Sequence, residues 1–200
     1  MIFQAMELVR QNLNAFIASV IPLTNPEPVV LGNIAFATPD NPATAVDESA
    51  QIYMSLVNVE EELTFKNLSA VRQSEIRPLA YVNPPMHINL FLLFSANHRD
   101  YNMAMQHLGL VLFFFQGNRT FSIARTPVAA TGVFAAPGEP ENNIKLTLDL
   151  MSLTFEQVNH LWGSLGGKQQ PFLLFKARQV EIDAARMMET GEPITEIHIN

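Results

Sequence analysis

The clearest hydrophobic pattern in the chain lies between residues 83 and 98. The pair Pro84-Pro85 cannot donate backbone hydrogen bonds, so it excludes a helix and marks the start of an extended segment. After it, one face of a strand carries Met86, Ile88, Leu90, Leu92 and Phe94. The other face starts polar and turns apolar, at His87, Asn89, Phe91 and Leu93. The pattern predicts a strand in the middle of a sheet that is covered on both faces.

Three segments have the spacing of helices. Apolar residues recur at three- and four-residue steps from Ile2 to Val20, which predicts an amphipathic helix that ends before Pro22. Asp100 is expected to cap a second helix that ends near Gly117. Thr154 and Gln157 form a capping box for a third helix, which Gly166-Gly167 would end.

The second and third helices differ in how apolar they are. The helically spaced apolar residues of the second helix are Tyr101, Met105, Leu108, Leu112 and Phe115, and the stripe is widened by Val111, Phe113 and Phe114. A helix this apolar is expected to be buried on more than one side. In the third helix, the residues expected to face the core are Phe155, Val158, Leu161, Trp162 and Leu165.

Further strands are predicted at Val29–Phe36, Gln51–Glu62, Thr120–Ile123, Ile144–Met151 and Phe172–Ile182. In the second of these, one face is expected to hold Ile52, Met54 and Leu56 and the other Tyr53, Val57 and Val59, while in the fourth Leu146, Leu148 and Leu150 are expected to face inward. Residues 63–82 are weakly patterned and fit either an extended hairpin or a loop. Residues 37–50 and 126–143 are predicted loops, and residues 187–193 are turn-like.

The order of these elements predicts an α+β fold: a mixed, largely antiparallel sheet with three helices packed chiefly on one face. Residues 1–182 are expected to form one domain. Residues 183–200 are expected to form a C-terminal extension, in which Thr195, Ile197 and Ile199 alternate as in a strand.

Composition changes this picture in two ways. Charged residues make up 16% of the chain, against roughly 25% in typical globular domains. Either sister subunits cover much of the surface, or the surface is neutral and rich in Asn, Gln and Thr. The net charge is −7 and Lys and Arg do not cluster, which argues against nucleic-acid binding.

The chain also lacks the patterns of a membrane or exported disulfide-bonded protein. The longest apolar run, Leu110–Phe115, is far shorter than the ~20 residues of a membrane span. The N-terminus lacks a signal-peptide pattern and there is no cysteine. We therefore expect no membrane span, and folding in the cytoplasm.

No active site is recognisable. Residues 163–168 resemble a phosphate-binding loop in composition, but the leading glycine is one position too close and Gln169 replaces the magnesium-binding hydroxyl. We interpret the segment as a glycine cap. The five histidines have no metal-site spacing: His87, His98, His107, His160 and His198. Of these, His87 and His160 are expected to be hydrogen-bonded core or interface residues.

Nucleophilic and acid–base chemistry are also unsupported. There is no Gly-x-Ser-x-Gly motif, and cysteine catalysis is excluded by composition. The adjacent carboxylates Glu60–Glu62 alternate between strand faces and fit a solvated strand end. We therefore expect no catalytic, cofactor-binding or metal-binding residues and no cofactor.

Several segments together resemble one family. They are Val29–Ile34, Leu56–Glu62, Asn83–His98, Phe113–Asn118 and, the most distinctive, Leu153–Lys168. In order and content they resemble the cap, or tail-terminator, proteins of phage-tail-like extracellular contractile injection systems. The similarity runs from the first helix to about Ile182.

The resemblance implies a tail-terminator-like fold and a structural, non-enzymatic role. Such proteins are expected to form a sixfold ring on the distal end of the inner tube and sheath, ending polymerisation and stabilising the extended particle. The implied partners are further copies of the chain in a homo-hexamer, the inner-tube subunit and the contractile sheath subunit. The protein would be made in the bacterial cytoplasm and released as part of a particle. Some relatives carry a further C-terminal domain.

Two alternatives stay open. One is a terminator of only the tube or only the sheath, or an adaptor between them, and the other is an enzyme with an unrecognised site. Residues 195–199 are predicted to add a strand to a sheet edge of a sister or sheath subunit, with a self-docked tail as the alternative. Residues 37–50 and 126–143 are expected at contacts with tube, sheath or sister subunits.

Overall fold

The computed structural model describes residues 2–21, 27–36, 52–62, 71–74, 77–82, 86–98, 100–122, 144–182 and 187–191. The helices of this part of the chain are α1 (Ile2–Val20), α2 (Tyr101–Gly117), α3 (Phe155–Ser164) and the short 3₁₀ helix η1 (Ile34–Phe36). The three predicted α-helices are confirmed, with the predicted caps: the Asp100 side chain accepts from the Asn102 N–H, and Thr154 and Gln157 form a capping box.

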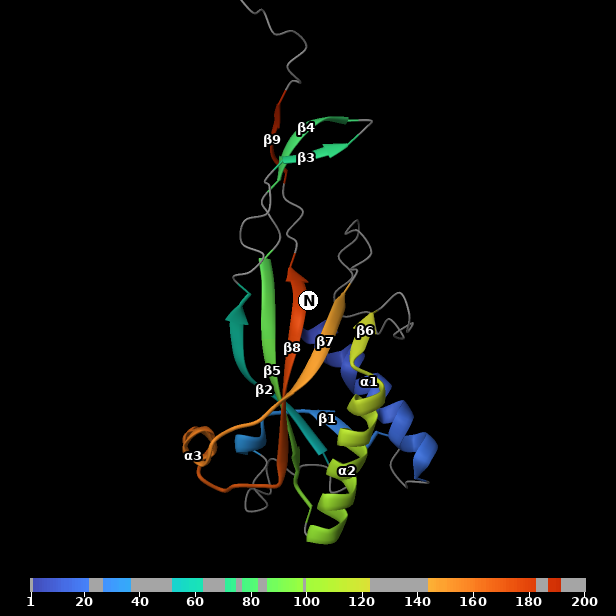
Figure 1. The fold of residues 1–200 in the computed structure, drawn as a ribbon, viewed down its shortest axis with the longest axis vertical. Helices are drawn as coiled ribbons and strands as arrows, with labels where there is room; N and C mark the ends of the chain where they lie inside the picture. The colour runs from blue at the N-terminus through green and yellow to red at the C-terminus, as the bar shows by residue number, and fades with distance from the viewer. Residues whose placement is uncertain are drawn as a thin grey trace, which may run out of the picture.

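A six-stranded sheet lies at the centre of the molecule (Figure 1). Its order is β1 (Val29–Leu31), β2 (Ile52–Glu61), β5 (Met86–Ala96), β8 (Phe172–Ile182), β7 (Lys145–Met151) and β6 (Thr120–Ser122). Only β1 and β2 pair in parallel, and the other neighbours are antiparallel. The fold is therefore α+β with a mixed, largely antiparallel sheet, as the sequence predicts.

Strand β5 occupies the interior of this sheet, between β2 and β8. From Ile88 to Ala96 every residue of β5 is buried. The face that carries Ile88, Leu90, Leu92 and Phe94 contributes to one hydrophobic core, and Phe91 and Leu93 contribute to another. The prediction of a central strand covered on both faces is confirmed.

The helices divide between the two faces of the sheet. Side chains of α1 and α2 join the larger core, whereas Trp162 of α3 joins the smaller core with Phe91 and Leu93. Figure 1 shows α3 on the side away from α1 and α2. Two of three helices on one face agrees with the expected arrangement.

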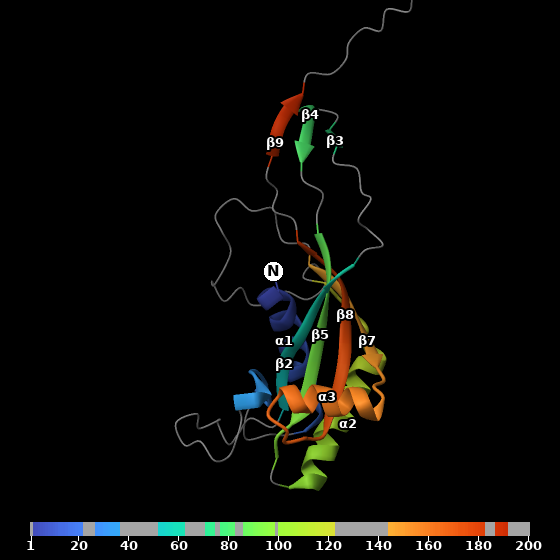
Figure 2. The same ribbon diagram turned by 90° about the vertical axis from the view of Figure 1, so that its left-hand side faces the viewer.

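A second, three-stranded sheet has the order β3 (Val71–Ser74), β4 (Arg77–Val82) and β9 (Met187–Gly191). It lies beyond the end of the first sheet in Figure 1 and Figure 2. Strand β4 leads into β5 and β8 leads into β9, and both pairs are antiparallel. The hairpin alternative for residues 63–82 is thus supported, while the turn-like prediction for residues 187–193 is wrong, because Met187–Gly191 pairs with β4.

Two strand predictions need correction. Strand β1 ends at Leu31, short of the predicted Phe36. After Leu31, hydrogen bonds with the Ser55 side chain take the place of continued strand pairing with β2. The Ser55 hydroxyl donates to the Gly32 carbonyl at 2.5 Å and accepts from the Ile34 N–H at 3.1 Å, which supports η1 in place of a longer strand.

In β2, a bulge between Leu56 and Asn58 shifts the register. The extra residue places Val59 opposite Leu90, on the face of Ile52 and Met54, so the predicted placement of Val59 beside Tyr53 is wrong. The sequence does not reveal this bulge, because both faces of the strand carry apolar residues and the pattern looks the same with or without an extra residue.

Residues 37–50, residues 126–143 and residues 195–199 lie outside the described residues, so predictions about them stay predictions. Within the described part of the chain, no helix is sufficiently long and apolar to span a bilayer.

Candidate functional site

The outer face of α2 exposes large apolar side chains. These are Tyr101, Met105, Leu112 and Phe113, of which Tyr101 and Phe113 are 66% and 64% exposed. The helix packs inward through a different set: Ala104, His107, Leu108, Val111, Phe114 and Phe115. The expectation that α2 is buried on more than one side is therefore wrong within this chain, because one side of the helix stays exposed at Tyr101, Met105, Leu112 and Phe113.

The reason is that α2 carries two apolar stripes at helical spacing. The inner stripe contains Ala104 and His107, which their residue types alone do not mark as core residues. Their helical spacing to Leu108 and Val111 is the signal that would have identified them. An apolar outer stripe that no described element covers is a candidate surface for a partner.

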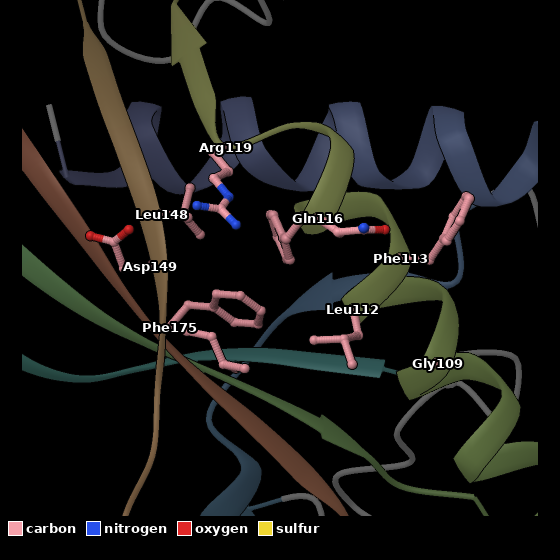
Figure 3. Close-up of a pocket in the computed structure, with 10 residues that line it drawn as sticks. Gly109, Leu112, Phe113, Gln116, Arg119, Leu148, Asp149 and Phe175 are labelled. Carbon is pink, nitrogen blue, oxygen red and sulfur yellow. The ribbon is translucent and has the colours of Figure 1, made fainter.

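Beside this stripe, a groove of about 630 Å³ opens between α2 and β7 (Figure 3). Its lining residues are Gly109, Leu112, Phe113, Phe115, Gln116, Arg119, Leu148, Asp149, Leu150 and Phe175. Leu148 and Phe175 are buried, whereas Leu150 is 51% exposed, so the predicted inward position of Leu150 is only half correct. The groove borders the part of β7 beyond Thr147, where the pairing with β6 ends.

The chemistry of the groove is that of a contact surface. Asp149 is paired with Arg178 at 2.9 Å, and Arg119 directs its guanidinium into the groove (Figure 3). Within the described residues, no three His, Asp or Glu side chains are grouped as a metal ion would require. The lining offers no nucleophile paired with a base.

Helix α3 presents a second exposed apolar residue. Phe155 is 96% exposed, so its predicted inward position is wrong. It is the first residue after the cap Thr154, and the helix is anchored further along by the buried Trp162. Phe155 is thus available to a partner on the face opposite α2.

The glycine-rich end of α3 is a helix cap. Gly166 and Gly167 have φ of +100° and +80°, and the Gly167 N–H donates to the Trp162 carbonyl at 2.7 Å. This is the bonding pattern of a Schellman motif, which satisfies carbonyls at the end of a helix. The interpretation of residues 163–168 as a glycine cap is confirmed.

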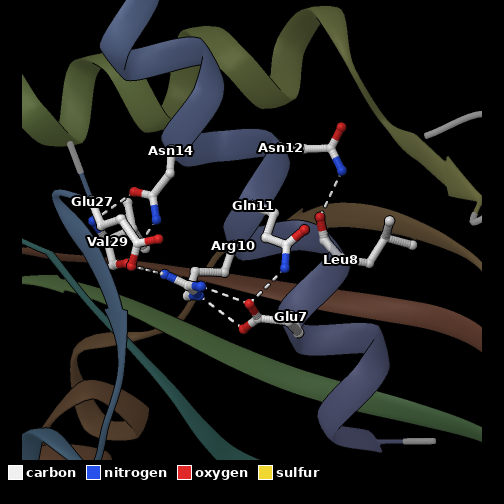
Figure 4. Close-up of polar contacts among 8 residues, drawn as sticks. All are labelled: Glu7, Leu8, Arg10, Gln11, Asn12, Asn14, Glu27 and Val29. Carbon is white, nitrogen blue, oxygen red and sulfur yellow. Dashed lines mark hydrogen bonds and ion pairs between the residues drawn. The ribbon is translucent and has the colours of Figure 1, made fainter. Parts of the chain in front are cut away.

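The most connected polar cluster lies on α1 and is structural (Figure 4). Arg10 bonds Glu7 at 2.6 Å and Glu27 at 2.8 Å. The hydrogen bond from Arg10 lowers the pKa of Glu7 below its usual value, and Glu7 in turn raises the pKa of Arg10. Both groups stay charged at neutral pH, so the cluster has no group poised to exchange a proton.

Next to it, buried Asn14 connects α1 to the edge strand β1 (Figure 4). Its Nδ2 donates to the Val29 carbonyl at 3.0 Å, and its Oδ1 accepts from the Val29 N–H at 2.8 Å. A single side chain therefore satisfies both backbone groups that face away from β2.

The histidine that the fold buries is one that the sequence did not single out. His107 is fully buried in α2, and neither ring nitrogen has a hydrogen-bond partner among the described residues. The centroid of its ring lies 6.1 Å from the ring centroid of His98. Burial and the neighbouring His98 lower the pKa of His107. By contrast His160 is exposed on α3, near Glu156 at 3.7 Å, so a core position is wrong for it, and an interface position stays a prediction.

Comparison with known proteins gives the following matches. The sequence model described as the Pvc16 N-terminal domain matches residues 5–196. A search of curated proteins finds no match.

Two similar solved structures have a TM-score of 0.58. One is the PVC sheath/tube terminator of an extracellular contractile injection system in its extended state, with 13% identity over 100% of this chain and 61% of that chain. The other is the anti-feeding prophage cap, a tube-terminating cap, with 17% identity over 96% of this chain and 58% of that chain. The chain thus spans about three fifths of the length of either protein. It shares their fold.

We predict that Asn14→Ala lowers the free energy of unfolding by about 2–4 kcal/mol, because two buried backbone groups of Val29 lose their partner. Urea denaturation followed by circular dichroism measures the change. Asn12→Ala is the matched control on the same helix, since Asn12 is part-buried and bonds only the Leu8 carbonyl of its own helix. Equal effects of the two substitutions would contradict the role assigned to Asn14.

We predict that stability falls on acidification through His107. The unfolded chain binds a proton at this residue near pH 6.5, while the folded chain has a lowered pKa. Stability is therefore fully present above about pH 6.5 and decreases, by up to about 1.4 kcal/mol per pH unit, as the pH falls toward the lowered pKa. His107→Leu should flatten the curve between pH 7.5 and 5.5 in urea titrations, and a curve as steep as that of the unchanged chain would contradict this role of His107.

Proposed function

Because the chain belongs to the Pvc16 N-terminal domain family, we propose that it is a structural cap subunit that ends the tube and sheath of an extracellular contractile injection particle. The match over residues 5–196 carries this proposal. It is supported by the shared fold with two proteins whose structures are of a sheath/tube terminator and of a tube-terminating cap. Neither of these relatives is described as an enzyme.

The surface of the chain supports a role in assembly. Large apolar side chains are exposed on both faces of the sheet, on α2 and at Phe155 of α3. Exposed apolar patches mark contact surfaces in soluble proteins. An apolar stripe on α2 and the separate exposed Phe155 on the opposite face suit a subunit that contacts a sister copy and a polymer end.

In this proposal six copies form a closed ring. A ring of identical subunits needs two different, complementary patches on each copy, so that every subunit contacts one neighbour with each patch. The open groove between α2 and β7 and the separate apolar residue on α3 provide two unlike surfaces. The ring would meet the last turn of the tube and the sheath at once.

The main prediction concerns the particle. Removing this chain from cells that make the particle should broaden the length distribution and leave tube ends without a terminal disc, because nothing ends polymerisation. Electron microscopy of negatively stained particles measures both properties. Supplying the full chain from a second gene copy should restore uniform length and closed ends. Particles of normal length with closed ends in the absence of the chain would overturn the proposal.

A second prediction separates the partners. Purified chain should sediment with inner-tube polymers and with sheath polymers when each is offered alone, and bound material should sit at polymer ends in micrographs. Mass measurement of the released complex should give six copies. Binding to only one polymer would replace the proposal by the alternative of a tube-only or sheath-only terminator.

A further inference from the structure

The outer edge of β7 is paired with a neighbouring strand along only part of its length. Strand β6 pairs with β7 from Lys145 to Thr147, and the Leu148 N–H then donates to the Arg119 carbonyl at 2.8 Å. In an antiparallel ladder, backbone groups of alternate residues point to the same side. The N–H and C=O of Leu150 therefore point away from β8, toward an edge where the described residues provide no strand.

The open edge of β7 borders the groove described above. Leu112 and Phe113 of α2 form one wall, and Leu150 lies on the strand itself. A strand added to this edge would hydrogen-bond to Leu150 and direct alternate side chains into the groove. The combination of free backbone groups and an apolar wall is the arrangement that binds an extended, alternating peptide.

The opposite side of the sheet has a free edge of a different kind. Beyond Met54, β2 has no described neighbour on its outer side, but it contains the bulge at residues 56–58 and ends in Glu60 and Glu61. Bulges and charged residues protect sheet edges against pairing. The edge of β7 has no such bulge, and the bulge is the difference between the two edges, since Glu60 of β2 is paired with Lys176 just as Asp149 of β7 is paired with Arg178.

We propose that residues Thr195–Ile199 of a second copy of this chain pair with β7 at Leu148–Met151 and place Ile197 and Ile199 in the groove. This inference rests on the proposed function only in that it needs copies side by side. The segment has the required alternation of Thr195, Ile197 and Ile199. The segment carries no Lys or Arg, so it adds no positive charge beside Arg119, which enters the groove without an ion pair among the described residues.

The occupant is assigned to another copy because the chain's own segment is short for the distance. Phe175 lies opposite Leu150 at the groove, and from there β8 continues to Ile182 and β9 to Gly191, away from the groove (Figure 1). At about 3.3 Å per residue, the strand parts after Phe175 cover about 36 Å. The stretch from Glu192 to Ile199 spans at most about 28 Å when fully extended. The length therefore favours a segment from another copy over the chain's own segment as the occupant.

The absence of cysteine allows a direct test between copies. One full-length chain carries Leu112→Cys and the other carries Ile197→Cys, and the two are mixed under mild oxidation. Because each chain has one thiol, a disulfide between the two variants forms only in trans. We expect at least about tenfold more mixed dimer than with the control mixture of Val59→Cys and Ile197→Cys, since Val59 lies on the protected edge.

A second variant checks the backbone contact. Leu150→Pro removes only the N–H that points outward, which an edge strand tolerates, so the chain should fold by circular dichroism and lose the cross-link between Leu112→Cys and Ile197→Cys. Equal cross-linking at Leu112 and Val59, or none at Leu112, overturns the inference. Particle length in cells lacking the chain is a separate measurement, so this failure is distinguishable from failure of the proposed cap function.

Discussion

The structure depends on the register of β5 between β2 and β8. Every residue of β5 from Ile88 onward is buried, and its two faces contribute to different cores. A slip of one residue would exchange Leu92 and Phe94 with Phe91 and Leu93, and would set each against the wrong helices. The strand therefore decides where α1 and α2 lie, where α3 lies, and which parts of their surfaces stay free.

Much of this was predictable from sequence, because the strongest local signals do not depend on tertiary context. The Pro84-Pro85 start of β5, the cap Asp100 and the capping box of Thr154 and Gln157 all gave element boundaries that the structure confirms. Each of these signals involves only a few neighbouring residues: a backbone position without an N–H, or a side chain that bonds a free N–H.

The candidate site was not predictable in the same way. Helix α2 is apolar on two sides, so its sequence alone does not determine which stripe meets the sheet; the position of the sheet does. The groove lies between α2 and β7, which are far apart in the sequence. It also depends on β7 extending beyond its pairing with β6. Phe155 follows a helix cap, where an apolar residue at helical spacing can still point to solvent. The low share of charged residues was interpreted either as cover by sister subunits or as a neutral polar surface, and the exposed stripe of α2 is an apolar part of that surface.

The alignment of β4–β9 with β5–β8 has a mechanical consequence. The same two chain segments cross from one sheet to the other, and each ladder is antiparallel. A pull on the second sheet along its strands would draw β5 and β8 in the same direction from the same end, so the shear would fall on their ladders with β2 and β7. The fold can therefore pass tension from a bound partner into its most buried strand, β5.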